Sequence, residues 1–262
     1  MAWVAQRSDG SIASVGFDKA QAPMDEDITL VDIADELAIR VMEGSINMQW
    51  VLSGPPAQQP SPALLTKRLL GNRNPAYPSM MGQIDADALM SIAHSLPPGS
   101  IGVEIGSRLG GSAKLLLEHA PQIKRLYCID SSWASDSRCG DDVHLQWILE
   151  HYAIDPATTL HDYARTLLKD YAAARLLAAK SPYDISWWTE PVDFIFEDSR
   201  HTNPQLRDNL NFWVPLVRPG GVISGHDYIP DWPDVVQEVD QLRDRLGAEL
   251  HVQGTVWWMI KP

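Results

Sequence analysis

The segment VEIGSRLGGSAKLLL, residues 103–117, decides the fold that we expect of this chain. Its apolar start predicts a buried strand, its glycines predict a turn, and the run AKLLL predicts a helix. Gly106, Gly110 and Gly111 let the backbone approach a ligand closely, because a β-carbon would block that approach. The helix that begins near Ser112 offers unpaired N–H groups in its first turn. The segment therefore predicts a strand, a ligand-binding turn and a helix.

Strands and helices alternate on both sides of this segment. The predicted helices outside it include residues 85–96, most of 141–175, and 234–247. The predicted strands are 100–107, 123–132, 174–181, 192–198, 220–228 and the closing 250–262. Strands that alternate with helices imply right-handed crossovers and a parallel sheet. We therefore expect an α/β fold of Rossmann-like, doubly wound type, with a mostly parallel sheet and helices on both faces.

A proline-rich stretch separates this region from the N-terminus. Residues 54–62, GPPAQQPSP, contain four prolines and predict an extended linker. Before it, residues 1–53 predict a small α+β module with short strands and a helix from Ile28 to Met42. This module is a candidate for interaction or homo-oligomerisation, or a plain structural extension. Residues 63–262 form the expected main domain.

Composition excludes several classes of function. The chain of 262 residues is 45% hydrophobic, enough for a large core, and 21 basic against 34 acidic residues give a net charge of −13. Nucleic acid and anionic membranes are therefore not expected partners, because both need clustered cations. Cys128 and Cys139 are too few for a disulfide framework, which indicates a reducing compartment. No leader-like or membrane-spanning run is evident, so we expect a soluble cytoplasmic protein.

Two acids mark a candidate cofactor site. Glu104 precedes the first glycine of the turn, where it would repel a pyrophosphate but attract a cationic cofactor that carries an amino acid. The turn also lacks the GxGxxG spacing that a dinucleotide dehydrogenase needs. Asp130 ends the next strand, in YCIDSS, where α/β folds hold ribose hydroxyls. The alternatives are a helix-start acid for Glu104 and a turn residue for Asp130.

A second group of ionisable residues follows two later strands. The stretch VDFIFEDSRH brings Asp198 with His201 three residues on, and GGVISGHDY ends on His226 and Asp227. If these strands are neighbours in the sheet, all four side chains converge at the carboxyl ends of the strands, where ligands bind. The alternatives are that Asp198 caps the following helix and that His226 hydrogen-bonds a loop carbonyl.

This second group suits the activation of a hydroxyl. An aliphatic hydroxyl is a poor nucleophile until a base takes its proton or a metal lowers its pKa. Asp198 and Asp227 supply the hard oxygen ligands that Mg²⁺ prefers. His201 is a candidate general base, with substrate hydrogen bonding or a structural loop role as alternatives.

Residues 78–262 resemble the class I S-adenosylmethionine-dependent methyltransferases, most closely a branch of metal-assisted O-methyltransferases that act on sugars and sugar-bearing natural products. The matching stretches are VEIGSRLGGSA, CIDSSW, VDFIFEDSRH, FWVPLVRPGGVISGHDY and GTVWWMIKP. The resemblance implies that S-adenosyl-L-methionine binds at Glu104, Gly106, Ser107, Gly111, Ser112, Asp130, Ser131 and Ser181. It also implies that the aspartate of the Asp-x-x-His pattern binds metal and the histidine acts as base.

The sequence departs from that family at two places. Lys180 and Ser181 follow the third strand, where relatives often carry an acid near the adenine. His226 precedes Asp227, where some relatives carry two adjacent acids, so the expected metal site of Asp198, His226 and Asp227 would also accept Mn²⁺ or Zn²⁺. We expect methyl transfer to a hydroxyl of a small-molecule or glycosylated acceptor. A hydroxylase-like relative and a non-catalytic assembly protein on the same scaffold remain alternatives.

Overall fold

The computed structural model describes residues 2–7, 12–16, 28–33, 77–142 and 145–262. The chain divides into two compact units, residues 1–72 and 73–262. In the first unit, an antiparallel sheet has the order β2-β1-β3 and consists of β1 (Ala2–Arg7), β2 (Ile12–Gly16) and β3 (Ile28–Ile33). The predicted linker 54–62 lies outside the described residues, so its boundaries stay a prediction.

The helix predicted to begin at Ile28 is wrong over its first residues. Residues 28–33 form β3, and all six residues of β3 pair antiparallel with β1, from Ala2 opposite Ile33 to Arg7 opposite Ile28. The reason is local: the sequence ITLVDI is rich in β-branched residues, which favour a strand over a helix. The rest of the predicted helix lies outside the described residues.

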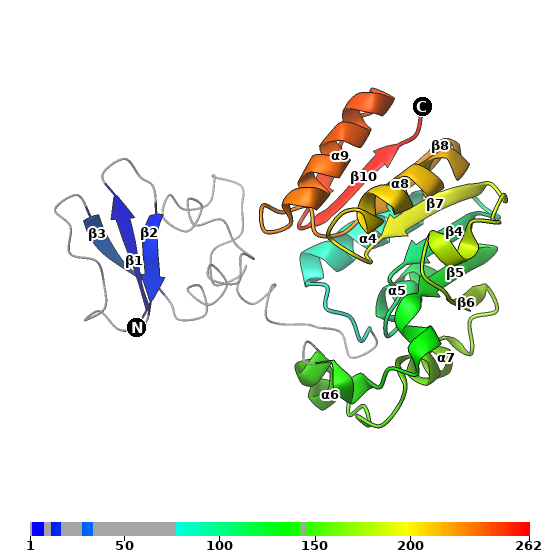
Figure 1. Cartoon of the computed structure of the whole chain (residues 1–262), viewed down its shortest axis with the longest axis horizontal. Helices are drawn as coiled ribbons and strands as arrows, with labels where there is room; N and C mark the ends of the chain where they lie inside the picture. Colours follow the sequence, from blue (N-terminus) through cyan, green and yellow to red (C-terminus); the bar gives the residue numbers. More distant parts are fainter. Residues whose placement is uncertain (1, 8–11, 17–27, 34–76, 143–144) are drawn as a thin grey trace. The chain divides into compact units, whose positions relative to one another are not determined.

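The second unit contains a seven-stranded sheet in the order β6-β5-β4-β7-β8-β10-β9 (Figure 1). Its strands are β4 (Ile101–Ile105), β5 (Arg125–Asp130), β6 (Ala174–Ala178), β7 (Val192–Glu197), β8 (Val217–Gly225), β9 (His251–Gln253) and β10 (Val256–Ile260). Strands β4 to β8 pair in parallel, and β10 runs antiparallel to both β8 and β9. The mostly parallel, Rossmann-like sheet predicted from the sequence is confirmed.

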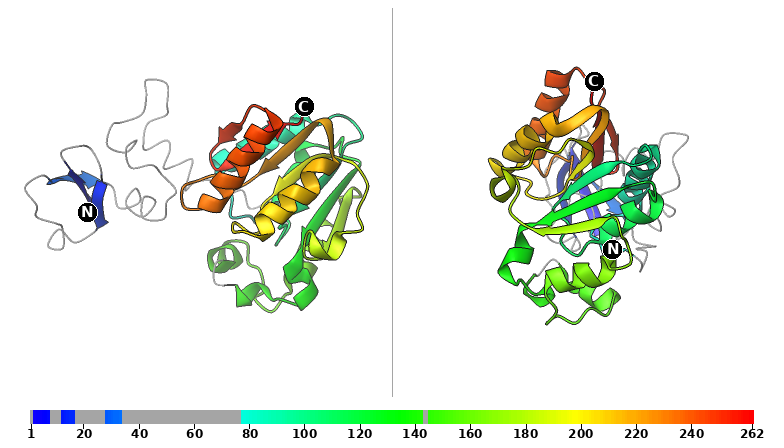
Figure 2. Two further views of the ribbon diagram at one scale, coloured as in Figure 1. Left: turned by 45° about the horizontal axis from the view of Figure 1, so that its top comes forward. Right: turned by 90° about the vertical axis from the view of Figure 1, so that its right-hand side faces the viewer.

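Helices cover both faces of this sheet (Figure 2). The helices are α4 (Gln83–Ser95), α5 (Gly111–His119), α6 (Gln146–His151), α7 (Leu160–Leu168), α8 (Gln205–Leu216) and α9 (Pro233–Leu246). One core joins α4, α5, α6 and α7 to Phe194 and Phe196, and the other joins α8 and α9 to Val103 and Ile195. None of the described helices combines the length and apolar character needed to cross a membrane.

The alternation of side chains along β4 and β7 separates these two cores. Phe194 and Phe196 face one set of helices and Ile195 faces the other, as expected for a period of two along a strand. The strand ends then project loops from one edge of the sheet. Asp198 directly follows β7 and His226 directly follows β8, and these strands pair in parallel with Glu197 opposite Gly225. The adjacency that the sequence analysis required is therefore present.

Candidate active site

A cavity of about 760 Å³ lies at the carboxyl ends of the parallel strands. This volume falls within the range typical of small-molecule sites. The predicted site residues that line it are Gly106, Ser107, Gly111, Ser112, Asp130, Ser131, Ser181, Asp198, His201, His226 and Asp227. Both groups of residues singled out from the sequence therefore open onto one cavity. Glu104 is the predicted site residue that does not line it.

The glycines of the turn make room for the chain itself. Gly106 has a φ of +96°, and a β-carbon there would lie 2.2 Å from the carbonyl oxygen of Asp198. A β-carbon on Gly111 would lie 2.4 Å from the carbonyl oxygen of Pro78. Real β-carbons do not approach backbone atoms so closely, so both positions require glycine for packing. Contact of these glycines with a cofactor stays a prediction.

Glu104 is fully buried beneath this turn. Burial raises the pKa of its carboxyl to about 7, and the nearby hydroxyls of Ser107 and Ser112 oppose that rise. Among the described residues, neither carboxylate oxygen makes a hydrogen bond of normal geometry. A buried carboxylate without strong partners is costly, so a cation bound above the turn would stabilise it.

Asp130 serves the turn and the cavity together. Its Oδ2 accepts a hydrogen bond from the backbone N–H of Arg108 at 2.7 Å, and its Oδ1 accepts one from the N–H of Ser132 at 2.8 Å. The first bond holds Arg108 at a φ of +44°, and the second caps a 3₁₀ helix over Ser131–Ser135. The turn role of Asp130 is therefore present, and its ribose role stays a prediction.

Ser181 also lines the cavity and follows β6. Its Oγ accepts a hydrogen bond from Nε1 of the buried Trp213 at 2.9 Å. Trp213 belongs to α8, the helix that follows Asp198 in the chain. This bond fixes Ser181 at the cavity wall, where the family resemblance expects the adenine.

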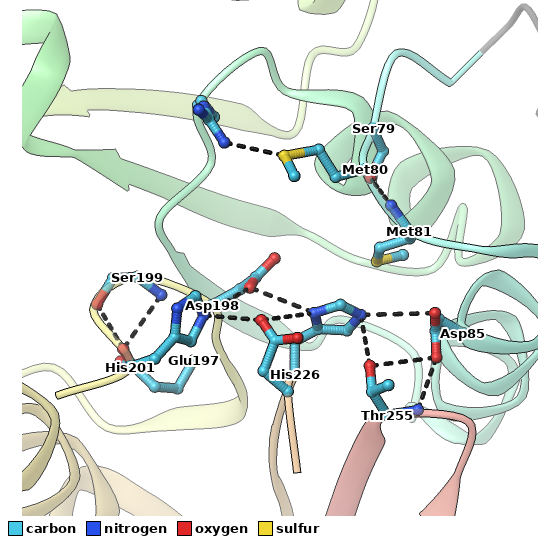
Figure 3. Close-up of polar contacts among 12 residues, drawn as sticks. Ser79, Met80, Met81, Asp85, Glu197, Asp198, Ser199, His201, His226 and Thr255 are labelled. Carbon is cyan, nitrogen blue, oxygen red and sulfur yellow. Dashed lines mark hydrogen bonds and ion pairs between the residues drawn. The ribbon is translucent and has the colours of Figure 1, made fainter. Parts of the chain in front are cut away.

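The four residues that follow β7 and β8 converge as predicted, and Figure 3 shows Asp198, His201 and His226 beside one another. His201 Nε2 lies 2.8 Å from Asp227 Oδ2 and 3.8 Å from Asp198 Oδ1. His226 Nδ1 lies 3.1 Å from Asp227 Oδ2 and 3.6 Å from Asp198 Oδ1. Potential ligand atoms of Asp198, His201 and Asp227 all lie within 4.8 Å of one another. This spacing is suited to a single ion.

The pKa values of this group follow from its charges. Burial lowers the pKa of His201, but the carboxylates of Asp198 and Asp227 overcome burial and raise it to about 9. Burial likewise lowers the pKa of His226, and Asp198, Asp227 and Asp85 raise it well above its ordinary value. Burial would raise the pKa of Asp227, yet the two imidazoles hold it far below its usual range. Without an ion, the group is thus two carboxylates balanced by two imidazolium rings.

Asp227 adopts a strained backbone conformation. Its φ of +61° lies in the left-handed region, which non-glycine residues enter rarely. Such residues are concentrated at functional sites, where the surrounding structure maintains the strain.

Asp198 does not cap the next helix, because the N-cap of α8 is Pro204 and no side chain caps it. The structural alternative considered for Asp198 therefore does not hold.

Sequence reasoning missed two residues that contact this group. Asp85, in the first turn of α4, lies 3.7 Å from His226 Nε2, and Thr255, between β9 and β10, lies 2.9 Å from the same atom. Asp85 is an acid on the apolar face of α4, four residues before Leu89. An acid on the apolar face of a predicted helix was therefore the signal that could have identified Asp85. No local signal marks Thr255, which the sheet brings in from the end of the chain.

Residues 103–228 match a family model described as a methyltransferase domain. The O-methyltransferase NovP is 16% identical, with 87% of this chain and 99% of that chain covered and a TM-score of 0.51. A candidate caffeoyl-CoA O-methyltransferase from Staphylococcus aureus is 13% identical over 70% of this chain and 86% of that one, with a TM-score of 0.49. A candidate methyltransferase from Streptococcus mutans, solved with SAH, is 13% identical over 70% and 100%, with a TM-score of 0.48.

These comparisons bear on fold and activity in different ways. At such low identity, the likeness to NovP shows the Rossmann-like fold. The family match covers the glycine turn, Asp130 and the residues from Asp198 to Asp227. It supports a methyltransferase domain over this part of the chain.

Proposed function

We propose that this chain is an S-adenosylmethionine-dependent O-methyltransferase that acts, with the help of a divalent cation, on a hydroxyl of a small-molecule or glycosylated acceptor. One observation carries the proposal. Asp198, His201 and Asp227 converge on a cavity that the glycine turn also lines. Carboxylates and an imidazole beside a cofactor turn suit the deprotonation of a hydroxyl at the point of methyl transfer.

The cofactor would lie against the turn between β4 and α5. S-adenosylmethionine, when bound, supplies an electrophilic methyl group on a sulfonium. Ser107 and Ser112 line the cavity and offer hydroxyls, and Asp130 lines it at the end of β5, where ribose is held. Glu104 has no strong hydrogen-bond partner among the described residues, and its charge suits an ammonium group above the turn. Ser131 and Ser181 complete the proposed binding surface.

Asp198 and Asp227 would hold the cation, with His226 as a third ligand. A divalent cation, when bound, lowers the pKa of an adjacent hydroxyl and offsets alkoxide charge. Carboxylate oxygens favour Mg²⁺, and the imidazole of His226 would also accept Mn²⁺ or Zn²⁺. The donor set fits, since His226 Nδ1 lies 3.6 Å from Asp198 Oδ1 and 3.1 Å from Asp227 Oδ2, and the two carboxylates are close enough to share one ion.

His201 would take the proton from the acceptor. The nearby Asp198 and Asp227 raise the pKa of His201 to about 9, so the ring is protonated and cannot act as a base near pH 7. If a cation bound both carboxylates, they would no longer raise the pKa of His201, and Nε2 could lose its proton. Trp232 packs against the ring, with centroids 4.6 Å apart, and so limits its rotation. His201 would then be a base only when the carboxylates are occupied.

The partners of this chain follow from the same site. We propose a small-molecule or sugar-bearing acceptor and no nucleic acid, because the net charge of −13 opposes phosphate binding. We also propose that residues 1–53 serve interaction or homo-oligomerisation. The described part of that module is a sheet whose edge strands β2 and β3 each pair on one side, and edge pairing is one route to self-association.

Calorimetric titration tests this function directly. The purified protein would be titrated with S-adenosylmethionine and with its demethylated product, each in Mg²⁺, in Mn²⁺ and in chelator. Saturable one-to-one binding would justify a screen of hydroxylated acceptors, with the demethylated product as readout. No cofactor binding under any of these conditions would reject the proposal.

Two variants and one control separate the roles of metal and base. Asp198→Asn removes a carboxylate from the cavity, and Glu249→Gln removes one from an exposed position outside it. We expect Asp198→Asn to lose most metal-dependent turnover while it retains cofactor binding, and Glu249→Gln to behave as wild type. His201→Ala should retain cation binding and lose turnover. Full turnover of His201→Ala would contradict the assignment of the base.

A further inference from the structure

A chain of polar contacts connects the candidate cation site to two residues outside the matched methyltransferase region. Asp85 lies on α4 and Thr255 in the turn between β9 and β10, whereas the match covers residues 103–228. Figure 3 shows the His226 ring between Asp198 on one side and Asp85 with Thr255 on the other. Nothing in the proposed reaction uses Asp85 or Thr255 directly, so their position needs a separate explanation.

Four contacts form this chain, and the donor is known in three of them. Asp85 Oδ1 accepts a hydrogen bond from the N–H of Thr255 at 2.7 Å and another from the Thr255 hydroxyl at 3.3 Å. Asp85 Oδ2 accepts one from the N–H of Gly82 at 3.1 Å. The Thr255 hydroxyl lies 2.9 Å from His226 Nε2. A continuous path therefore runs from the carboxylate through the hydroxyl to the imidazole.

The direction of each hydrogen bond follows from what each group can donate. An ionised carboxylate only accepts, so the Thr255 hydroxyl donates its single proton to Asp85. The hydroxyl oxygen then has lone pairs but no proton for His226, so it accepts from Nε2–H of the ring. A cation that binds Nδ1 must displace the proton that the metal-free ring carries there, and the neutral imidazole that results keeps one proton. With that proton on Nε2, its Nδ1 has a free lone pair, and Nδ1 is the atom that faces Asp198 and Asp227.

We propose that Asp85 and Thr255 are positioning residues that hold the His226 ring with its Nδ1 lone pair directed between Asp198 and Asp227, so that His226 binds the divalent cation through nitrogen. This inference rests on the cation site of the proposed function. It adds the residues that orient the ligand and determine which ring nitrogen is used. Histidine ligands commonly donate their second N–H to an oxygen in this way.

The surroundings of Asp85 show that its placement is specific. Its side chain is only 13% exposed, and that of His226 only 12%. A β-carbon on Gly254, which has a φ of +64°, would lie 2.2 Å from Asp85 Oδ1. Any other residue at 254 would therefore displace the carboxylate. A buried carboxylate is retained only where it is well paired, and here the pairing ends on the imidazole at the cavity.

Thr255→Val is the variant that tests this inference most cleanly. Valine has the shape of threonine without the hydroxyl, and the backbone N–H of residue 255 still donates to Asp85. The matched controls are Thr255→Ser, which keeps the hydroxyl, and Thr166→Val, which removes an exposed hydroxyl from α7 that donates to the carbonyl of Asp162. Affinities for Mn²⁺ and Mg²⁺ would be measured by calorimetry, together with binding of the demethylated cofactor as a check on the fold.

We expect Thr255→Val to bind Mn²⁺ about 10- to 100-fold more weakly, as for the loss of other residues that orient a ligand. The Mn²⁺ to Mg²⁺ preference should fall as well, because a misplaced imidazole affects the ion that favours nitrogen more than the one that favours oxygen. Thr255→Ser and Thr166→Val should match wild type. A general loss of structure would instead weaken cofactor binding and leave the ion preference unchanged.

Two outcomes would overturn the inference, and they are distinguishable. If wild type binds Mn²⁺ and Thr255→Val binds it equally well with the same ion preference, the positioning role is wrong and the cation site stands. If wild type binds neither ion, the cation site itself is wrong, and this inference fails with it. Asp85→Asn provides a second measurement, with the same expected direction. An amide has one acceptor oxygen, so it cannot accept the bonds from Thr255 at one atom and the bond from Gly82 at the other.

Discussion

His201 Nε2 lies 2.8 Å from Asp227 Oδ2, so an imidazole that follows β7 faces a carboxylate that follows β8. The contact joins two loops that emerge from neighbouring parallel strands at the same edge of the sheet. The carboxylate raises the pKa of His201 and the imidazole lowers the pKa of Asp227, as opposite charges at short distance do. The pair is therefore an internal ion pair in the absence of a metal, and a bound cation must compete with its proton.

That competition predicts a pH-dependent stability of the metal-free protein. The pKa of His201 is raised from 6.5 to about 9, so its protonated form stabilises the fold fully below pH 6.5 and this stabilisation is lost as the pH rises through 9. The advantage of wild type over His201→Asn should be at most about 3 kcal/mol at low pH. Urea unfolding in chelator from pH 6 to pH 10 measures it. An advantage that stays constant over this range would contradict the prediction, with a substitution of the exposed His94, His94→Asn, as the control.

Cation affinity should change in the opposite direction over the same range. A cation at Asp198 and Asp227 competes with the proton that these carboxylates stabilise on His201. We expect the dissociation constant for Mn²⁺ to fall as the pH is raised from 6.5 toward 9. The dependence should become shallower in His201→Asn, which has no such proton to displace. Equal slopes in both proteins, measured by calorimetry, would show that His201 does not compete.

The backbone of Asp227 predicts a difference between two substitutions that both remove its charge. At a φ of +61°, asparagine is tolerated because its short polar side chain bonds locally, whereas alanine is not. Asp227→Asn should therefore be more stable than Asp227→Ala by about 1 kcal/mol, and both should lose the cation. Unfolding in chelator provides the comparison. Equal stabilities would show that the surrounding structure does not enforce the left-handed conformation.

The part of the site that follows neighbouring strands could be predicted from the sequence. Asp198 and Asp227 follow strands with clear apolar patterns, and parallel neighbours end at one edge, so their convergence could be inferred before the structure was known. Asp85 and Thr255 could not be inferred, because 170 residues separate them and only the packing of α4 against the β9–β10 turn brings them together. No short sequence motif can indicate a contact between residues so far apart in the chain.

Local patterns also failed where two structures compete for the same residues. The stretch that begins at Ile28 carries apolar residues at helical spacing, yet its β-branched residues pair along the whole length of β1 as a strand. Glu104 shows a different limit. Its place before the glycine turn was predicted, but its burial beneath the turn, away from the cavity lining, depends on which face of β4 each residue occupies.

Glu104 provides the prediction that best separates binding from folding. Burial raises the pKa of its carboxyl from 4.5 to about 7, so the fold favours the protonated form, and the charged form costs stability as the pH rises from 4.5 through 7. Glu104→Gln should therefore stabilise the cofactor-free protein at pH 8, by at most about 3 kcal/mol, and have little effect at pH 4.5. The same variant should bind S-adenosylmethionine more weakly, because the carboxylate that would face its ammonium group is gone. Urea unfolding and calorimetry at pH 8 give the two results, and a variant that is both more stable and equally tight in binding would show that Glu104 has no role in holding the cofactor.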